Sequence, residues 1–272
     1  MKNHIKTVIN KISIIFAVVL FPVLGFSQSY VAISVGPSVP LGQYSQSDIL
    51  DNIFVGPNLA GSANTGFQAS IDAAYYFDSH FGISFMGGYS QQGYNTTSLS
   101  DLYNSQNSQG NGNGYPLPPL QITDNPYRNV FLFIGPSVGV GNEKLFADFR
   151  FMMGIYSSSF NNLYYYAGDT SGYNDSKFTA PSSVQFGFLF GASLRYKLNE
   201  KVSFLFKVDM IISKQSFNVH ETDESYGNGN YNNNGQYAPQ ETDEYMTSES
   251  NVSVFSPSIG IALNLDKPVK KP

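Results

Sequence analysis

Apolar side chains alternate with small or polar ones along much of this chain, most clearly in VQFGFLFGASLRYKL at residues 184–198. Every second residue from Val184 to Leu198 is apolar, and the residues between them are mostly Gly, Ser and charged or amide side chains. Side chains of a β-strand point alternately to its two faces. The pattern therefore predicts a strand with one apolar and one small, polar face, longer than the usual strand of about 5–6 residues.

Seven further segments show the same two-faced pattern, and we expect each of them to be a strand. The clear ones are 65–77, 81–90, 145–156 and 202–212, and the weaker ones are 29–41, 129–141 and 251–265. Together with 184–198 they make eight strands, which predicts an all-β protein.

Charged residues inside these segments lie on the small, polar face: Asp72, Asp148, Arg150, Arg195, Lys197, Lys207 and Asp209. A water-soluble sandwich would carry many charges on an outward face and turn its apolar face inward. Here the charges are sparse among Gly, Ser and Ala, as in the filled interior of a narrow barrel. The continuous apolar face suits lipid, where a charge costs about 2–4 kcal/mol at the bilayer midplane.

Connections between the expected strands alternate strictly between long and short. Short ones lie at 78–80, 141–144 and 199–200, and long ones follow the first strand and fill 91–126, 157–182 and 214–248. Transmembrane barrels have short periplasmic turns and long external loops in this order, and lipid requires the sheet to close. We therefore predict a transmembrane antiparallel up-and-down β-barrel of eight strands, with ten as the alternative if 91–126 or 214–248 contains a further hairpin.

The beginning of the chain predicts export. Lysines precede the apolar run ISIIFAVVLFPVLGF at residues 12–26, and small residues stand before Gln28. The run is shorter than the roughly 20 residues that a membrane-spanning helix needs, and this arrangement is typical of a cleavable signal peptide. We expect three regions: a signal peptide at 1–27, an outer-membrane barrel domain at 28–265 and a basic periplasmic tail at 266–272.

Composition and charge exclude several classes of function. The chain has no Cys, which removes disulfides, thiolate metal sites and cysteine catalysis. Its formal net charge of −5, without a basic stripe, argues against nucleic acid. His220 with Asp223 is the single arrangement that resembles a catalytic pair at an outer rim, and an accidental loop histidine explains it better. We therefore expect no enzyme activity and no cofactor.

The alternation, the placement of the charges and the order of long and short connections resemble the small outer-membrane β-barrel family. This family includes the eight-stranded OmpA-like and OmpX-like barrels and the PorT-like barrels, and the resemblance covers about residues 29–265. It implies a pore-less or narrow-pored barrel in the outer membrane of a Gram-negative cell, inserted among outer-membrane lipids by the assembly machinery. Such barrels often end in an aromatic residue, whereas here a basic tail follows IGIALNL at 259–265.

Six of the inward charges are expected to pair across the bore, because a lone buried charge is costly. This lumen charge network comprises Asp72, Asp148, Arg150, Arg195, Lys207 and Asp209. An Asp148–Arg195 contact is the first expectation, and Asp148 with Arg150 or with Lys207 is the alternative.

Two ETDE runs, at 221–224 and 241–244, stand in the last long connection. If 214–248 forms an extended hairpin, the runs face each other, and like charges placed opposite one another are destabilising. A divalent cation with oxygen ligands would relieve this, with Glu221, Asp223, Glu224, Glu241, Asp243 and Glu244 as candidate metal ligands. The alternative is two solvated acidic stretches in loops that are strongly acidic overall.

Proline occurs inside three of the expected strands, in GPSV at 36–39 and 135–138 and in SPSI at 256–259. Proline cannot donate a hydrogen bond to a strand ladder. Pro37 and Pro257 should lie at similar heights where the first and last strands meet. They are interpreted either as bulges that help a narrow barrel to curve or as a seam weakened for opening.

Three functional classes fit these predictions. The first is a structural barrel, or one that binds other envelope proteins through its external loops. The second is a small porin-like channel for cations or small solutes, favoured by the acidic rim, and the third is a rim enzyme. Large apolar residues on the inward face favour a plugged lumen, and therefore the first class: Phe131, Phe133, Phe146, Leu189 and Leu205.

Overall fold

A computed structural model describes most of the chain, in ten pieces: residues 29–45, 63–77, 80–93, 95, 121–123, 126–142, 144–159, 163–169, 172–226 and 240–265. The predicted signal peptide at 1–27 and the basic tail at 266–272 lie outside them. The elements in these residues are strands and one short 3-10 helix, η1 (Gly42–Tyr44). Within the described part of the chain, no helix is long and apolar enough to cross a membrane.

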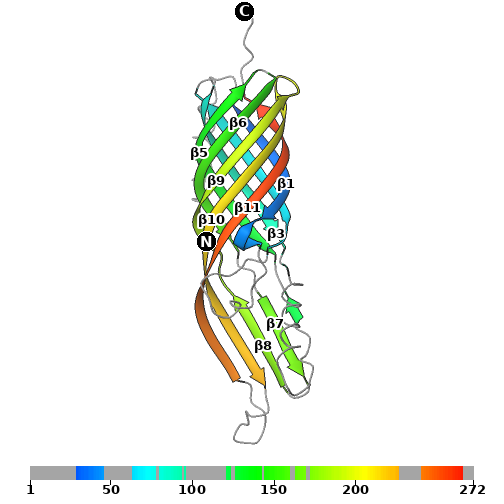
Figure 1. Cartoon of the computed structure of the whole chain (residues 1–272), viewed down its shortest axis with the longest axis vertical. Helices are drawn as coiled ribbons and strands as arrows, with labels where there is room; N and C mark the ends of the chain where they lie inside the picture. Colours follow the sequence, from blue (N-terminus) through cyan, green and yellow to red (C-terminus); the bar gives the residue numbers. More distant parts are fainter. Residues whose placement is uncertain are drawn as a thin grey trace, which may run out of the picture.

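Eight strands form a closed antiparallel barrel (Figure 1). They are β1 (Tyr30–Pro40), β2 (Gly66–Tyr76), β3 (Phe81–Gln92), β5 (Tyr127–Gly141), β6 (Leu145–Ser158), β9 (Ser183–Lys197), β10 (Val202–Tyr226) and β11 (Gln240–Asn264). Each strand pairs with the next one of this series, and β11 returns to pair with β1. The eight segments predicted from alternation are these eight strands, so the predicted fold is confirmed.

Three shorter strands lie outside the ring: β4 (Gln121–Thr123), β7 (Leu163–Asp169) and β8 (Gly172–Thr179). They pair in the order β8–β7–β4, and β8 pairs with the distal part of β10. At the lower end of Figure 1 they form one projecting sheet with the continuations of β10 and β11. The alternative of ten barrel strands is therefore wrong. The additional hairpin comes from 157–182, and it stands outside the barrel wall.

Two of the short turns repeat the sequence Asn-Glu-Lys and share one local structure. The Asn142 side chain accepts hydrogen bonds from the backbone amides of Lys144 and Leu145, at 2.9 and 3.0 Å. The Asn199 side chain does the same for Lys201 and Val202, at 2.9 Å each. An asparagine that bonds the backbone two residues ahead favours a tight turn, so these residues fix the short end of the barrel.

The two faces of the wall are as the alternation predicted. Phe186, Phe188 and Phe190 are 55%, 41% and 49% exposed on the outside, whereas Lys207 and Asp209 are fully buried inside. A soluble protein rarely exposes an apolar band of this extent. An outer apolar band around a polar interior is the arrangement of a barrel that spans a membrane.

Replacing Phe188 with Arg tests the assignment of the faces. We expect Phe188→Arg to lower the stability of the folded barrel in lipid by about 2–4 kcal/mol, because the charge would enter the bilayer. The neighbouring inward change Gly187→Ser should be milder, since a Cβ there meets its nearest neighbour at 3.2 Å. Folding into phospholipid vesicles, followed by heat-modifiable gel migration across a urea series, measures both. Equal urea midpoints for the two variants would contradict the assigned faces.

Candidate functional site

Five of the six predicted lumen charges converge inside the barrel, and we call them the lumen charge cluster: Asp72 on β2, Asp148 and Arg150 on β6, and Lys207 and Asp209 on β10. Their exposed fractions are at most 4%. Strands far apart in sequence supply them, so the cluster ties opposite parts of the wall together.

Arg150 is the centre of the cluster. Its Nη1 lies 3.0 Å from Asp72 Oδ1 and its Nη2 lies 2.9 Å from Asp209 Oδ1. Its Nε lies 3.5 Å from Asp148 Oδ1. Lys207 Nζ then lies 2.8 Å from Asp72 Oδ2 and 3.1 Å from Asp209 Oδ2. Each cation thus contacts more than one carboxylate, which offsets the cost of burying the charges.

Strand register explains how Arg150 reaches Asp209. Arg150 pairs with Gly191 of β9, and Gly191 pairs in turn with Asp209 of β10. Since Gly191 has no side chain, the guanidinium crosses above it. A Cβ at this position would overlap Asp209 Oδ1 and lie 3.2 Å from Arg150 Nε. Gly191 is therefore part of the site. Alternation alone places it on the inward face but does not show that the Arg150 guanidinium needs the space above it.

Inward serines complete the hydrogen bonding of the carboxylates. Ser70 and Ser34 donate to Asp72 Oδ2 at 3.1 and 3.3 Å. Ser193 donates to Asp148 Oδ2 at 2.7 Å. Sequence reasoning placed Ser70 and Ser193 on the small, polar face without giving them a role. The sequence feature that could have predicted their role is the position of these hydroxyls between or beside charged residues on that face.

Arg195 lies beside the cluster against aromatic rings. Its guanidinium carbon is 3.9 Å from the ring centre of Tyr30 and 4.8 Å from that of Phe146, both within the range of a cation–π interaction. The Tyr30 hydroxyl donates to Asp148 Oδ2 at 3.4 Å. A direct Asp148–Arg195 contact stays a prediction, while the alternative pairing of Asp148 with Arg150 is present.

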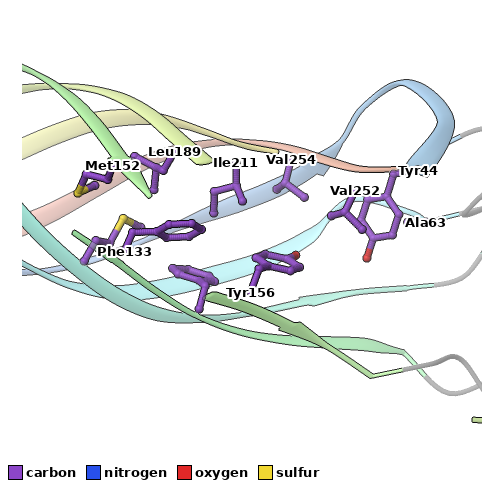
Figure 2. Packing of buried hydrophobic residues seen from close by; sticks show 11 residues of the cluster. Tyr44, Ala63, Phe133, Met152, Tyr156, Leu189, Ile211, Val252 and Val254 are labelled. Carbon is purple, nitrogen blue, oxygen red and sulfur yellow. The ribbon is translucent and has the colours of Figure 1, made fainter. Parts of the chain in front are cut away.

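Apolar side chains fill the lumen on both sides of the charges. Toward the short turns lies a group with Tyr76, Phe146 and Leu205, all buried. Toward the projecting sheet lies a larger group of buried residues, drawn as sticks in Figure 2: Tyr44, Ala63, Met86, Phe131, Phe133, Met152, Tyr156, Leu189, Ile211, Val252 and Val254. All five large apolar residues predicted to face inward are buried, as expected for a plugged lumen.

Beyond the wall, β10 and β11 remain paired as an external hairpin, from Lys214 opposite Asn251 to Ser225 opposite Gln240. Within it Glu221 stands opposite Glu244 and Glu224 opposite Glu241. The two acidic runs therefore face each other, as the hairpin hypothesis required.

The six candidate metal ligands do not form a metal centre. Alternation divides them between the two faces of the hairpin, and no three His, Asp or Glu side chains of the described residues are placed to hold a metal ion. Burial raises the pKa of Glu221 to about 7, and the neighbouring Asp223 and Glu244 carboxylates act in the same direction. Partial protonation of Glu221 near neutral pH thus reduces the repulsion without a cation.

The rim histidine has a different partner from the one considered in the sequence. His220 Nε2 lies 3.0 Å from Asp243 Oδ1 across the hairpin, and its ring stacks on Tyr245 with centroids 4.5 Å apart. Asp223 is an odd number of residues away along β10 and so belongs to the opposite face. His220 and Asp223 therefore do not form the catalytic-like pair that the sequence offered, and His220 instead helps to join the two strands.

Comparison with known proteins finds likeness in overall structure. No protein-family model matches the chain, and no curated protein is significantly similar to it. Among solved structures, Ail, the attachment invasion locus protein of Yersinia pestis, is 12% identical, with 88% of this chain and 99% of that chain covered and a TM-score of 0.36. A major outer membrane protein from Thermus thermophilus is also 12% identical, with 86% and 98% covered and a TM-score of 0.37. These values are low, so the barrel assignment rests on the strand pairings and faces described above.

Gly191→Ala tests the geometry of the lumen charge cluster. We expect the new methyl group to separate Arg150 from Asp209 and to destabilise the barrel by about 3 kcal/mol or more, as when a buried ion pair is broken. Gly187→Ala on the same strand and face is the control, because its closest contact of 3.2 Å is less severe. The urea midpoint of the barrel in lipid measures both. Indistinguishable midpoints would show that the cluster does not need the space above Gly191.

Proposed function

We propose that this chain is an integral outer-membrane β-barrel with a closed bore, which presents its projecting sheet to another envelope protein. The apolar exterior supports residence among outer-membrane lipids, and the closed ring requires the insertion machinery that such barrels use. The filled lumen supports an interaction role over a transport role. The proposal assigns no chemical reaction and no cofactor to the chain.

The proposal rests on one edge of the external hairpin. This edge is the side of β11 that pairs with β1 inside the barrel and extends beyond the end of β1. At the two ends of the β1–β11 ladder, Leu41 N donates to Ser253 O at 2.8 Å and Leu265 N donates to Ser29 O at 2.9 Å. Odd-numbered residues of β11 therefore direct their backbone groups toward β1. Since β1 ends at Pro40, no described strand pairs with this side of β11 from Gln240 to Ser250.

An unpaired edge of this length can accept an added strand from another protein. Glu241, Asp243 and Glu244 are exposed beside it, so an added strand with Lys or Arg side chains would be favoured by charge. A second copy of the same hairpin would bring acidic residues against acidic residues. The favoured occupant is thus an extended basic segment of a different protein.

Thr247→Pro tests this edge with little effect on the hairpin itself. Residue 247 is odd-numbered, so the proline removes an amide that faces the free side, and the ladder to β10 is retained. A photoreactive side chain at Thr242 in intact cells should yield several-fold less cross-linked product in the Thr247→Pro background, because an unmade hydrogen bond costs about 1–3 kcal/mol. Thr247→Val is the matched control and should keep the product. Equal cross-linking in both backgrounds would contradict strand addition at this edge.

A cation channel is the second candidate, because the acidic hairpin would concentrate cations near the mouth. Planar-bilayer recording of the reconstituted wild-type barrel separates the two functions. We expect no steady open level, since the lumen charge cluster and the two apolar groups occupy the bore. A steady cation-selective conductance would contradict the closed bore and support the channel.

A further inference from the structure

The hydrogen-bond ladder of the barrel is interrupted where its first and last strands meet. The β1–β11 register runs from Tyr30 opposite Asn264 to Val35 opposite Ile259, and resumes with Val39 opposite Phe255 at the same offset. Between these pairs, Pro37 of β1 falls opposite Pro257 of β11. The two prolines predicted to lie at similar heights are thus direct partners across the closing seam.

Both hydrogen bonds of this residue pair are missing. Odd-numbered residues of β1 and β11 exchange the ladder hydrogen bonds, as the Leu41–Ser253 and Leu265–Ser29 bonds show. Pro37 and Pro257 are both odd, so each would have donated to the other, and proline has no amide hydrogen. Their ladders to β2 and β10 on the other sides are continuous. The defect is therefore confined to the seam, where two carbonyl groups receive no ladder hydrogen bond.

Pro136 provides a comparison within the same barrel. It interrupts the β5–β6 ladder, in which pairing passes from Ile134 opposite Met153 to Ser137 opposite Arg150. Its partner by register is Phe151, which keeps its amide hydrogen. One donor is missing there and two are missing at the seam, so a proline alone does not produce the same defect.

Buried polar groups lie directly behind the seam. Gln68 of β2 pairs with Gly36 and is 1% exposed. Its Oε1 accepts a hydrogen bond from Ser256 at 3.0 Å, whereas its Nε2 has no hydrogen-bond partner. On the same inner side, Gln92 donates to Ser38. The seam therefore combines two carbonyls without ladder donors and one amide donor without an acceptor, in a wall otherwise surrounded by lipid.

Backbone groups without a hydrogen-bond partner are costly at membrane depth. A head group with two donors and one acceptor, such as a primary amide or a pair of hydroxyls, could bond both carbonyls and the Gln68 amide. We propose that the Pro37–Pro257 seam is a lateral port, through which the hydroxyl- or amide-bearing head of a lipid-phase amphiphile reaches Gln68 and the proline carbonyls. The amphiphile's apolar chain would remain outside, beside Val35 and Ile259, which are 55% and 54% exposed.

The absence of cysteine from the chain makes the port accessible to a direct test. A single Ser256→Cys places a thiol behind the seam, and Ser213→Cys places one behind the β10–β11 ladder, which is continuous on both sides of Ser213. Ser256 is fully buried and Ser213 is 4% exposed. The folded barrel in vesicles is treated with a long-chain alkyl maleimide confined to the bilayer and, separately, with a charged water-soluble maleimide. We expect the bilayer reagent to label Ser256→Cys at least about tenfold faster than it labels Ser213→Cys. A tenfold ratio corresponds to about 1.4 kcal/mol.

Restoring the missing donors should close the port. Pro37→Val with Pro257→Val in the Ser256→Cys background should reduce bilayer labelling to the Ser213→Cys rate, and Pro136→Val should leave it unchanged. If the double replacement does not fold, Pro257→Val alone should give an intermediate rate. Three outcomes would each overturn the lateral port. The two thiols could be labelled at equal rates, or the labelling of Ser256→Cys could stay unchanged when Pro37 and Pro257 are replaced. Ser256→Cys could also react with the water-soluble reagent alone. None of these outcomes depends on the edge of β11 that Thr247→Pro tests.

Discussion

Backbone hydrogen bonding in lipid is the constraint on which this structure depends. Strands that cross a bilayer must satisfy their amides and carbonyls with neighbouring strands, and a ring achieves this without leaving an edge. Eight strands leave a lumen about wide enough for side chains to fill. The inward residues must then be small or must satisfy one another, which is why Gly and Ser alternate with the few charges along the inner face of β9. The sequence pattern and the closed bore are thus consequences of the same requirement.

Charge balance in the lumen follows from this confinement. Asp72, Asp148 and Asp209 bring three carboxylates into a space closed to water, and Arg150 and Lys207 contact all of them between them. Arg195 lies over the ring of Tyr30, whose hydroxyl bonds Asp148. With Arg195 included, the number of cations equals the number of carboxylates. Because guanidinium and ammonium donors reach several strands, the cluster links β2, β6 and β10 across the bore and not only along the ladder.

Sequence periodicity predicted the wall well and the site less well, for a physical reason. Faces follow from alternation alone, so Phe188 and Lys207 were placed correctly from their own segments. Contacts across the bore depend on strand stagger, which a single segment does not reveal. The expected Asp148–Arg195 contact therefore stays a prediction, whereas its alternative, the pairing of Asp148 with Arg150, is present. Strands β7 and β8 escaped prediction because 163–179 has no two-faced apolar alternation.

Strand β11 connects the two places where the barrel departs from a continuous, closed wall. Its inner part meets β1 through the Pro37–Pro257 gap, and its outer part extends past the end of β1 with one side unpaired in the described residues. A strand added to that side would continue the line of β1 and extend its ladder with β11 beyond Ser253. Such pairing would fix the outer part of β11, leaving the proline gap as the weak point between two paired regions. The proline interruption and the unpaired edge of β11 therefore lie on one ladder, and each can be altered by substitutions that leave the other's hydrogen bonds intact.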